Sequence, residues 1–396
     1  MRKFATYRQF YLGSTLLLLL TCLTGCSRDE AEPLPRLNIY VYAPDRPTVT
    51  RSEVVPTEEE AKVHNLNIWV FRSNAPKTRV ASLSLNSESD LAGLNQNKSA
   101  SYSLEITDRN FALNPEPVDI YVMANVSADN SGTDYGVTTT ESSTLDAALF
   151  NGGPYYSYTA NTDYQAATSV SANGIPMSGV ARGKSVTDNN NVLHVNDANL
   201  KLVRGVSKIR FVFSSLAGEE GEEIDQLYID GITLDNNMLY TKEHLFLNSE
   251  HPDFWVEDAF NQPVQLVPSD LENPVAQNDD PTAYSYSSNM TESEYEAKID
   301  EWLGQEESPL TQKGIVYLPE SDQKLTGTIY FRLSSDMTPS GRKSATFSMV
   351  AGDFRRNQTW IVYAYYIGSS KLVVNTVNVV NWKEGDDMPE HDLNNW

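Results

Sequence analysis

The stretch from residue 37 to residue 71 restricts the fold most, because two alternating runs flank a segment that resists regular structure. In the first run, Leu37, Ile39 and Val41 fall on one face of an extended backbone. A second run at 66–71 repeats the period of two. Both runs predict β-strands with one apolar face, so a chain organised around them should form sheets.

The segment between the two runs, residues 43–64, reads as a linker open to cleavage. Three prolines and the acidic run 58–60 argue against a packed element there. The basic residue Arg51 follows Thr50 and precedes Ser52. A cut after Arg51 would leave the first strand joined to the rest only by sheet hydrogen bonds and side-chain packing. A strand held in this way can be exchanged for another.

The first 25 residues are typical of an export signal. Arg2, Lys3 and Arg8 precede the apolar run 15–20, and Leu23-Thr24-Gly25-Cys26 closes the segment. This ending resembles the lipobox of bacterial lipoproteins, which implies lipid on Cys26 and cleavage before it. An ordinary signal peptide or a short transmembrane helix is the alternative, but the run is short for about 30 Å of hydrocarbon.

The mature chain must be stabilised without disulfides, because one cysteine leaves with the signal and Cys26 would carry lipid. The 396 residues are enough for about two domains, and 40% hydrophobic residues support real cores. Loss of residues 1–25 removes three basic side chains and no acidic one, so the net charge moves from −23 to −26. Such a charge disfavours nucleic acid as a partner and favours solubility at an exposed surface.

Beyond residue 71, short alternating runs separated by Asn, Ser, Gly and Asp predict antiparallel β structure. Residues 129–173 are rich in small polar residues and Tyr, and predict exposed loops with one short helix at 143–149. Thr291, with Glu294 three residues later, predicts the start of a helix that ends at Gly304. The predicted strands are 80–85, 101–106, 118–124, 192–195, 202–213, 226–234, 314–318, 325–333, 345–350 and 359–367.

A turn-like cluster at 196–199 predicts a change of domain. The resulting division is a signal peptide at 1–25, a propeptide with the removable strand at 26–51, and two domains at 52–198 and 199–396.

The C-terminal run 372–382 is apolar and β-prone, and an acidic tail follows it to Trp396. A long apolar terminal strand offers an edge for pairing with another chain. The alternative is a strand completed inside its own sandwich. Both interpretations fit the sequence equally well.

Several local patterns, taken in order, resemble the fimbrillins of Bacteroidales, the FimA-like pilins of type V pili. They are the lipobox, Thr50-Arg51-Ser52, and the segments 66–71, 120–125, 174–179, 202–209, 356–357, 382 and 395–396. Each pattern alone is weak, and their order and spacing carry the resemblance.

The resemblance implies an all-β fold of two tandem transthyretin-like β-sandwich domains with one or two short helices. It also implies an arginine-specific protease, which here would cut between Arg51 and Ser52 and free the strand of Leu37, Ile39 and Val41. The groove would then receive a strand from another pilin subunit. The donor residues implied in this chain are Leu372, Val374, Val377, Val379, Val380, Trp382 and Trp396.

The expected product is therefore a subunit of a surface fimbrium, held at the outer membrane by its lipid until it is assembled. A tip or anchor accessory subunit, an adhesin for a host or bacterial receptor, and a glycan-binding surface lipoprotein outside pili are the alternatives. The adhesin interpretation depends on exposed aromatic residues at Tyr155, Tyr156, Tyr158, Tyr164, Trp255, Tyr284 and Tyr286.

No enzyme motif emerges. The five histidines have no metal-ligand spacing, no Gly-x-Ser-x-Gly elbow occurs, and no cofactor is expected. The cluster at 188–191 lacks the glycine and terminal glutamate of a calcium loop, so it predicts a turn.

Overall fold

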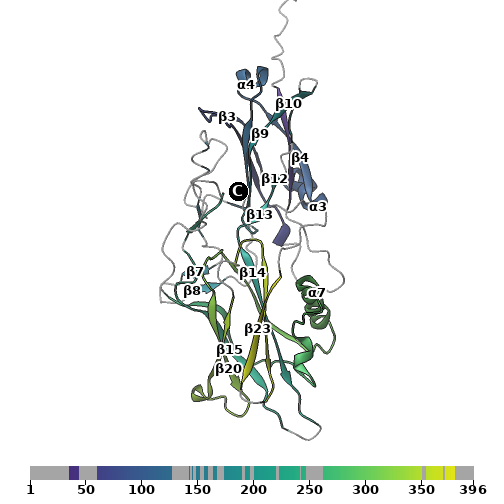
Figure 1. Ribbon diagram of the computed structural model, residues 1–396, viewed down its shortest axis with the longest axis vertical. Helices are drawn as coiled ribbons and strands as arrows, with labels where there is room; N and C mark the ends of the chain where they lie inside the picture. Colours follow the sequence, from purple (N-terminus) through teal and green to yellow (C-terminus); the bar gives the residue numbers. More distant parts are fainter. Residues whose placement is uncertain are drawn as a thin grey trace, which may run out of the picture. The chain divides into compact units, whose positions relative to one another are not determined.

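The computed structural model describes residues 35–43, 60–126, 142, 145, 149–151, 156–158, 164–166, 174–189, 192–196, 200–219, 223–240, 242–246, 262–349, 354–368 and 371–379. These residues are mainly β, and their strands form four larger sheets and one two-stranded ribbon (Figure 1). The predicted all-β class with two sandwiches is confirmed.

Sheets I and II build the first sandwich. Sheet I has the order β10 (Val186–Asn189), β11 (Val192–Val195), β1 (Arg36–Tyr42) and β12 (Leu200–Lys201), with β4 (Ser99–Glu105) also paired to β1. Sheet II has the order β13 (Val203–Arg204), β9 (Met177–Lys184), β5 (Val118–Ala124), β2 (Leu66–Arg72) and β3 (Arg79–Leu85).

Sheets III and IV build the second sandwich. Sheet III has the order β18 (Gln277–Asn278), β14 (Ser207–Leu216), β22 (Thr359–Tyr366) and β23 (Leu372–Val379), with β19 (Thr311–Leu318) also paired to β14. Sheet IV has the order β21 (Lys343–Ser348), β20 (Thr326–Leu333), β15 (Leu227–Leu234), β17 (Val264–Asp270), β8 (Tyr164–Ala166) and β7 (Tyr156–Tyr158).

The helix predicted after Thr291 is confirmed as α7 (Glu292–Leu303). The Thr291 hydroxyl accepts from the Glu294 N–H at 3.2 Å, and the Glu294 carboxylate accepts from the Thr291 N–H at 2.7 Å. Helices α3 (Glu88–Asn97) and α4 (Arg109–Leu113), and the 3₁₀ turns η1 (Pro281–Tyr284) and η2 (Pro339–Gly341), were not predicted. The helix predicted at 143–149 lies largely outside the described residues.

The predicted strand 202–213 is wrong in one respect, because it is two strands in two sheets. At Gly205, whose N–H donates to the Pro176 carbonyl at 2.8 Å, the chain passes from β13 in sheet II to β14 in sheet III. In β14, Lys208 and Arg210 alternate with apolar residues, yet each of these two basic residues is only 1% exposed. Polar partners described below cover both side chains.

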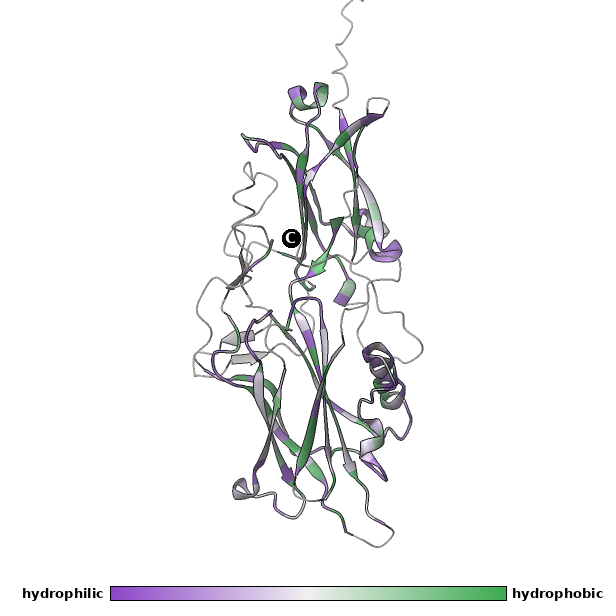
Figure 2. Cartoon of the chain, in the orientation of Figure 1, coloured by the Kyte–Doolittle hydropathy of each residue, from purple (hydrophilic) through white to green (hydrophobic). Residues whose placement is uncertain are grey.

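Most of the core is one cluster of buried apolar side chains, to which both sandwiches contribute residues. Hydrophobic and hydrophilic residues alternate along several strands (Figure 2). A second cluster lies between sheet III and α7. It contains Val212, Tyr295, Ile299, Leu310, Ile361, Tyr363 and Val377. Helix α7 therefore packs on the second sandwich.

Two connections pass reciprocally between the sandwiches. The chain between β5 and β9 of sheet II supplies β8, which pairs in parallel with β17 of sheet IV. The chain between β15 and β17 of sheet IV supplies β16 (Lys242–His244), which pairs with β6 (Leu149–Asn151), and Phe246, whose ring meets Tyr121 of sheet II edge-on at 5.3 Å. Among the described residues, no helix is long and apolar enough to cross a membrane.

Candidate strand-exchange site

Strand β1 contributes its apolar face to the core as the alternation predicts. Leu37, Ile39 and Val41 are 0%, 1% and 0% exposed, whereas Tyr40 on the opposite face is 53% exposed. Burial of three aliphatic side chains at roughly 1.5–3 kcal/mol each is the main apolar contribution that ties this strand to the fold.

Backbone pairing holds β1 on both of its edges. All seven residues pair antiparallel with β4, from Arg36 opposite Glu105 to Tyr42 opposite Ser99. On the other edge, residues 36–38 pair in parallel with β11, and residues 41–42 pair in parallel with β12. Strand β1 is therefore an interior strand, and its removal would open a slot between β4 and β11–β12.

The wall of this slot includes Tyr102 and Leu104 of β4, which stand opposite Ile39 and Leu37. Leu104 is fully buried, and the Tyr102 hydroxyl is buried without a hydrogen-bond partner among the described residues. Burial, with a smaller contribution from the Asp90 carboxylate, raises the pKa of Tyr102 to about 12. The slot is thus an apolar surface that only a strand with alternating apolar side chains would fill.

The chain after the predicted cut is fixed to the body, which corrects the expectation that the linker extends to residue 64. Asn95 exchanges two hydrogen bonds with the Val63 backbone, at 2.8 and 2.9 Å. Asn125, whose φ of 60° places it in the left-handed region, donates to the Lys62 carbonyl at 2.8 Å and accepts from the His64 N–H at 2.8 Å.

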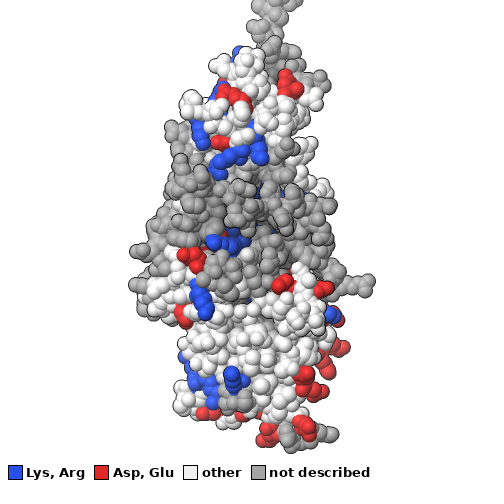
Figure 3. Space-filling view, viewed as in Figure 1, with Lys and Arg blue, Asp and Glu red and all other residues white. Residues whose placement is uncertain are grey.

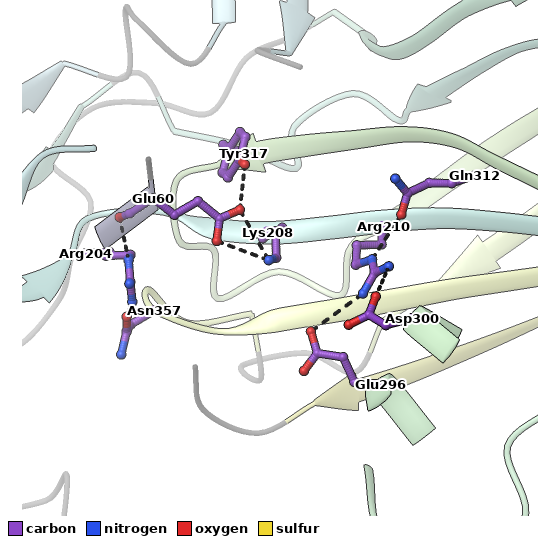
Figure 4. A network of polar contacts seen from close by, with 9 residues as sticks. All are labelled: Glu60, Arg204, Lys208, Arg210, Glu296, Asp300, Gln312, Tyr317 and Asn357. Atoms are coloured by element: carbon purple, nitrogen blue, oxygen red, sulfur yellow. Dashed lines mark hydrogen bonds and ion pairs between the residues drawn. The ribbon is translucent and has the colours of Figure 1, made fainter. Parts of the chain in front are cut away.

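Glu60 attaches the same segment of the chain to the second sandwich (Figure 4). Its carboxylate accepts from Lys208 Nζ at 3.2 and 3.3 Å and from the Tyr317 hydroxyl at 2.7 Å. Its backbone carbonyl accepts from Arg204 Nε at 3.0 Å, and Arg204 Nη1 donates to Asn357 Oδ1 at 2.9 Å. Both partners of the ion pair are buried, because Glu60 and Lys208 are each 1% exposed.

At the other end of the chain, the first part of the predicted donor run is in its own sheet. Strand β23 pairs antiparallel with β22 over eight residues, from Leu372 opposite Tyr366 to Val379 opposite Thr359. Leu372 and Val374 pack on the main core, while Val377 belongs to the cluster under α7. Both faces of β23 are therefore covered by its own chain.

Helix α7 is fixed over sheet III by charge as well as by apolar contact. Arg210 of β14 is 1% exposed, and its Nη2 donates to Asp300 at 2.7 Å, while Glu296 lies 3.8 Å from Nη1. Acidic side chains gather on the surface over this helix (Figure 3). The acidic residues of α7 are Glu292, Glu294, Glu296, Asp300 and Glu301.

The structure places only part of the predicted site set. Leu37, Ile39 and Val41 lie together in β1, and Leu372, Val374, Val377 and Val379 lie in β23. Cys26, Arg51, Ser52, Val380, Trp382 and Trp396 lie outside the described residues. Sequence reasoning missed Glu60, Lys208 and Tyr317. Only the charged residues within an otherwise β-prone run, Lys208 and Arg210, gave a signal that a polar partner was needed.

The aromatic residues considered for an adhesive surface have structural roles where they are described. Tyr284 meets Trp302 edge-on at 4.9 Å, and Tyr286 meets Tyr295 at 5.5 Å. Both tyrosines pack against α7 and its preceding turn. In the described part of the chain, no three His, Cys, Asp or Glu side chains are grouped in a way that could hold a metal ion.

A family model for the major fimbrial subunit protein (FimA) matches residues 36–225, beginning at the first residue of β1. A candidate cell adhesion protein from Parabacteroides distasonis is 16% identical, with a TM-score of 0.53 over 88% of this chain and 98% of that chain. The tip fimbrial protein Mfa3 from Porphyromonas gingivalis is 15% identical, with a TM-score of 0.47 over 87% and 99%. Comparison with curated proteins gave no match.

The class defined by this fold and family match is that of fimbrial subunits, which are structural and not catalytic. The chain matches the FimA-like fimbrillin family over residues 36–225, just under half of its length. It is accordingly a structural or accessory subunit of a surface fimbrium, which assembles with other pilin subunits.

Proposed function

We propose that this chain is exported as a lipoprotein anchored through Cys26, is cut between Arg51 and Ser52, and joins other pilin subunits by exchange of β1. The observation that carries the proposal is the position of β1. It is an interior strand of sheet I whose three buried side chains and two paired edges would leave a complete, strand-shaped slot. Strand addition satisfies unpaired backbone groups and buries alternating side chains, so the joint needs no covalent bond.

The retained end of the chain supports the same sequence of events. Residues 60–64 are fixed to the first sandwich by Asn95 and Asn125, and none of these bonds involves β1. A cut between 43 and 60 would therefore free β1 while the next residues remained attached. The division into domains at 52–198 and 199–396 remains part of this proposal.

We also propose that the donated strand lies in residues 380–396, with β23 as its fixed base. The predicted donor run began at Leu372, but β23 is paired along its length and covered on both faces. Withdrawing it would expose two buried clusters. The segment that follows β23 contains the remaining donor residues of the prediction, Val380, Trp382 and Trp396.

The test is digestion of the purified chain with an arginine-specific protease, followed by intact-mass analysis and unheated SDS gels. We expect a new N-terminus at Ser52 and SDS-resistant ladders, either alone or after addition of other pilin subunits. Arg51→Ala should abolish both, whereas Arg46→Ala, at a site made poor by Pro47, should behave as the parent chain. Normal ladders from Arg51→Ala would refute the cleavage step.

Cleavage without ladders, even with other subunits present, would favour a tip or anchor role over that of a stalk subunit. Cleavage that releases no strand would instead favour a surface lipoprotein outside pili.

A further inference from the structure

The connection between the two sandwiches, residues 200–208, is contacted by both sides of the segment in which the cut is proposed. On the upstream side, Leu200 and Lys201 form β12, which pairs with Val41 and Tyr42. The Leu202 N–H then donates to the Tyr42 carbonyl at 2.9 Å. These contacts belong to β1 and are lost when β1 leaves.

On the downstream side, Glu60 holds the same connection. Its carbonyl accepts from Arg204 and its carboxylate accepts from Lys208, at the distances given above. The Tyr317 hydroxyl completes the set from β19. No atom of this group comes from β1, so strand exchange leaves all of these bonds in place (Figure 4).

We propose that Glu60 is a retained clamp, which fixes residues 204–208 while the slot left by β1 is empty. The proposal rests on the proposed function, because it concerns the state between loss of one strand and entry of the next. A buried ion pair is a poor source of net stability, but removal of one of its partners is strongly destabilising. Breaking it leaves an unpaired buried charge, so the connection has one favourable arrangement whether or not β1 is present.

The positions of two amide groups allow the clamp to be separated from the strand. The Leu202 amide bonds to β1, and the Lys208 amide donates to the Gln358 carbonyl at 2.8 Å, beside the clamp. Hydrogen exchange at Leu202 therefore reports release of the strand, and exchange at Lys208 reports the state of the clamp.

The experiment compares hydrogen exchange of the full chain before and after β1 is removed. A thrombin recognition sequence inserted beside Arg51 gives a defined nick, and gel filtration in mild urea removes the freed strand. In the parent chain we expect exchange at Leu202 to rise at least tenfold and exchange at Lys208 to stay within about twofold. In Glu60→Gln, strand removal should raise exchange at Lys208 at least tenfold as well.

Asp230→Asn is the matched control, because Asp230 is also a buried carboxylate paired with a basic side chain, Arg332, but it lies in β15 away from the connection. It should leave the response of Lys208 to strand removal unchanged. Tyr317→Phe keeps the ion pair and removes one hydrogen bond, so the rise in exchange at Lys208 on strand removal should lie between those of the parent chain and Glu60→Gln. This variant replaces Glu60→Gln in the test if Glu60→Gln does not fold.

A purely structural role for Glu60 would raise exchange at Lys208 equally with and without β1, and that result would overturn the proposal. A tenfold rise at Lys208 in the parent chain would overturn it too. If the hydrogen-exchange rate of the Leu202 amide is unchanged after the nick and the urea wash, β1 does not leave. That outcome would refute the proposed function itself, and the clamp with it.

Discussion

Replacement of Ile39 by Ala tests whether apolar burial is what holds β1 in its slot. Ile39 is 1% exposed and stands opposite Tyr102 in the middle of the strand. Truncation of a fully buried Ile to Ala costs about 2–5 kcal/mol, because transfer energy is lost and a cavity remains. At 1.4 kcal/mol for each factor of ten, the dissociation constant of the cut strand should rise roughly 30- to 4000-fold.

The control lies one residue away on the same strand. Tyr40 is 53% exposed, so Tyr40→Ala leaves the backbone pairing and the buried face intact and should change the constant by less than about fivefold. The assay is competition of a fluorescent peptide of residues 36–42 with each variant peptide for the emptied slot. Equal dissociation constants for the two variants would refute the reasoning that the three inward side chains hold the strand.

Three other perturbations have expected outcomes. Because burial raises the pKa of Tyr102 to about 12, the neutral tyrosine stabilises the fold below pH 10, and this contribution is lost between about pH 10 and 12. Tyrosine ionisation is followed at 295 nm as the difference between the parent chain and Tyr102→Phe. The midpoint of this difference titration should move towards pH 10 once β1 is removed. The hydrogen bond from Arg72 lowers the pKa of Asp108, so the ionised carboxylate stabilises the fold above its ordinary pKa and the benefit disappears as pH falls through the lowered value. Since Asn caps helices as well as Asp, Asp108→Asn should lower the melting temperature at pH 7, and the difference from the parent chain should shrink as the pH falls below the ordinary pKa of the carboxyl. Truncation after Val379 should leave the melting temperature unchanged and abolish donation of a strand. Truncation after Gly368, which removes β23, should lower the melting temperature by several degrees. A larger loss of melting temperature from the truncation after Val379 than from the truncation after Gly368 would contradict our placement of the donor.

Local periodicity was sufficient to predict β1, the strand that fills the candidate slot. Leu37, Ile39 and Val41 were placed correctly on one buried face, because a period of two is a property of the strand itself. The capping box of α7 was equally predictable, since Thr291 and Glu294 lie within one turn.

The clamp was not predictable in the same way, because it depends on residues far apart in sequence. Glu60 lies in an acidic run that favours solvent, and its partner Lys208 is nearly 150 residues later. Only tertiary packing decides that the last glutamate of this run is buried. The position of β23 was left open for a related reason, since an apolar strand looks the same whether its own chain or another covers it.

The reciprocal connections also determine the order in which this chain can fold. Tyr121 of sheet II is covered by Phe246, which is synthesised more than 120 residues later, and β17 of sheet IV pairs with β8 from the earlier half. Contacts of such large sequence separation form slowly. As the chain emerges from N-terminus to C-terminus, the first sandwich therefore keeps an aromatic face uncovered until residues 242–246 have appeared. Expressed alone, a fragment ending near residue 204 would lack Phe246 and should aggregate, whereas the two sandwiches expressed together should fold as one unit.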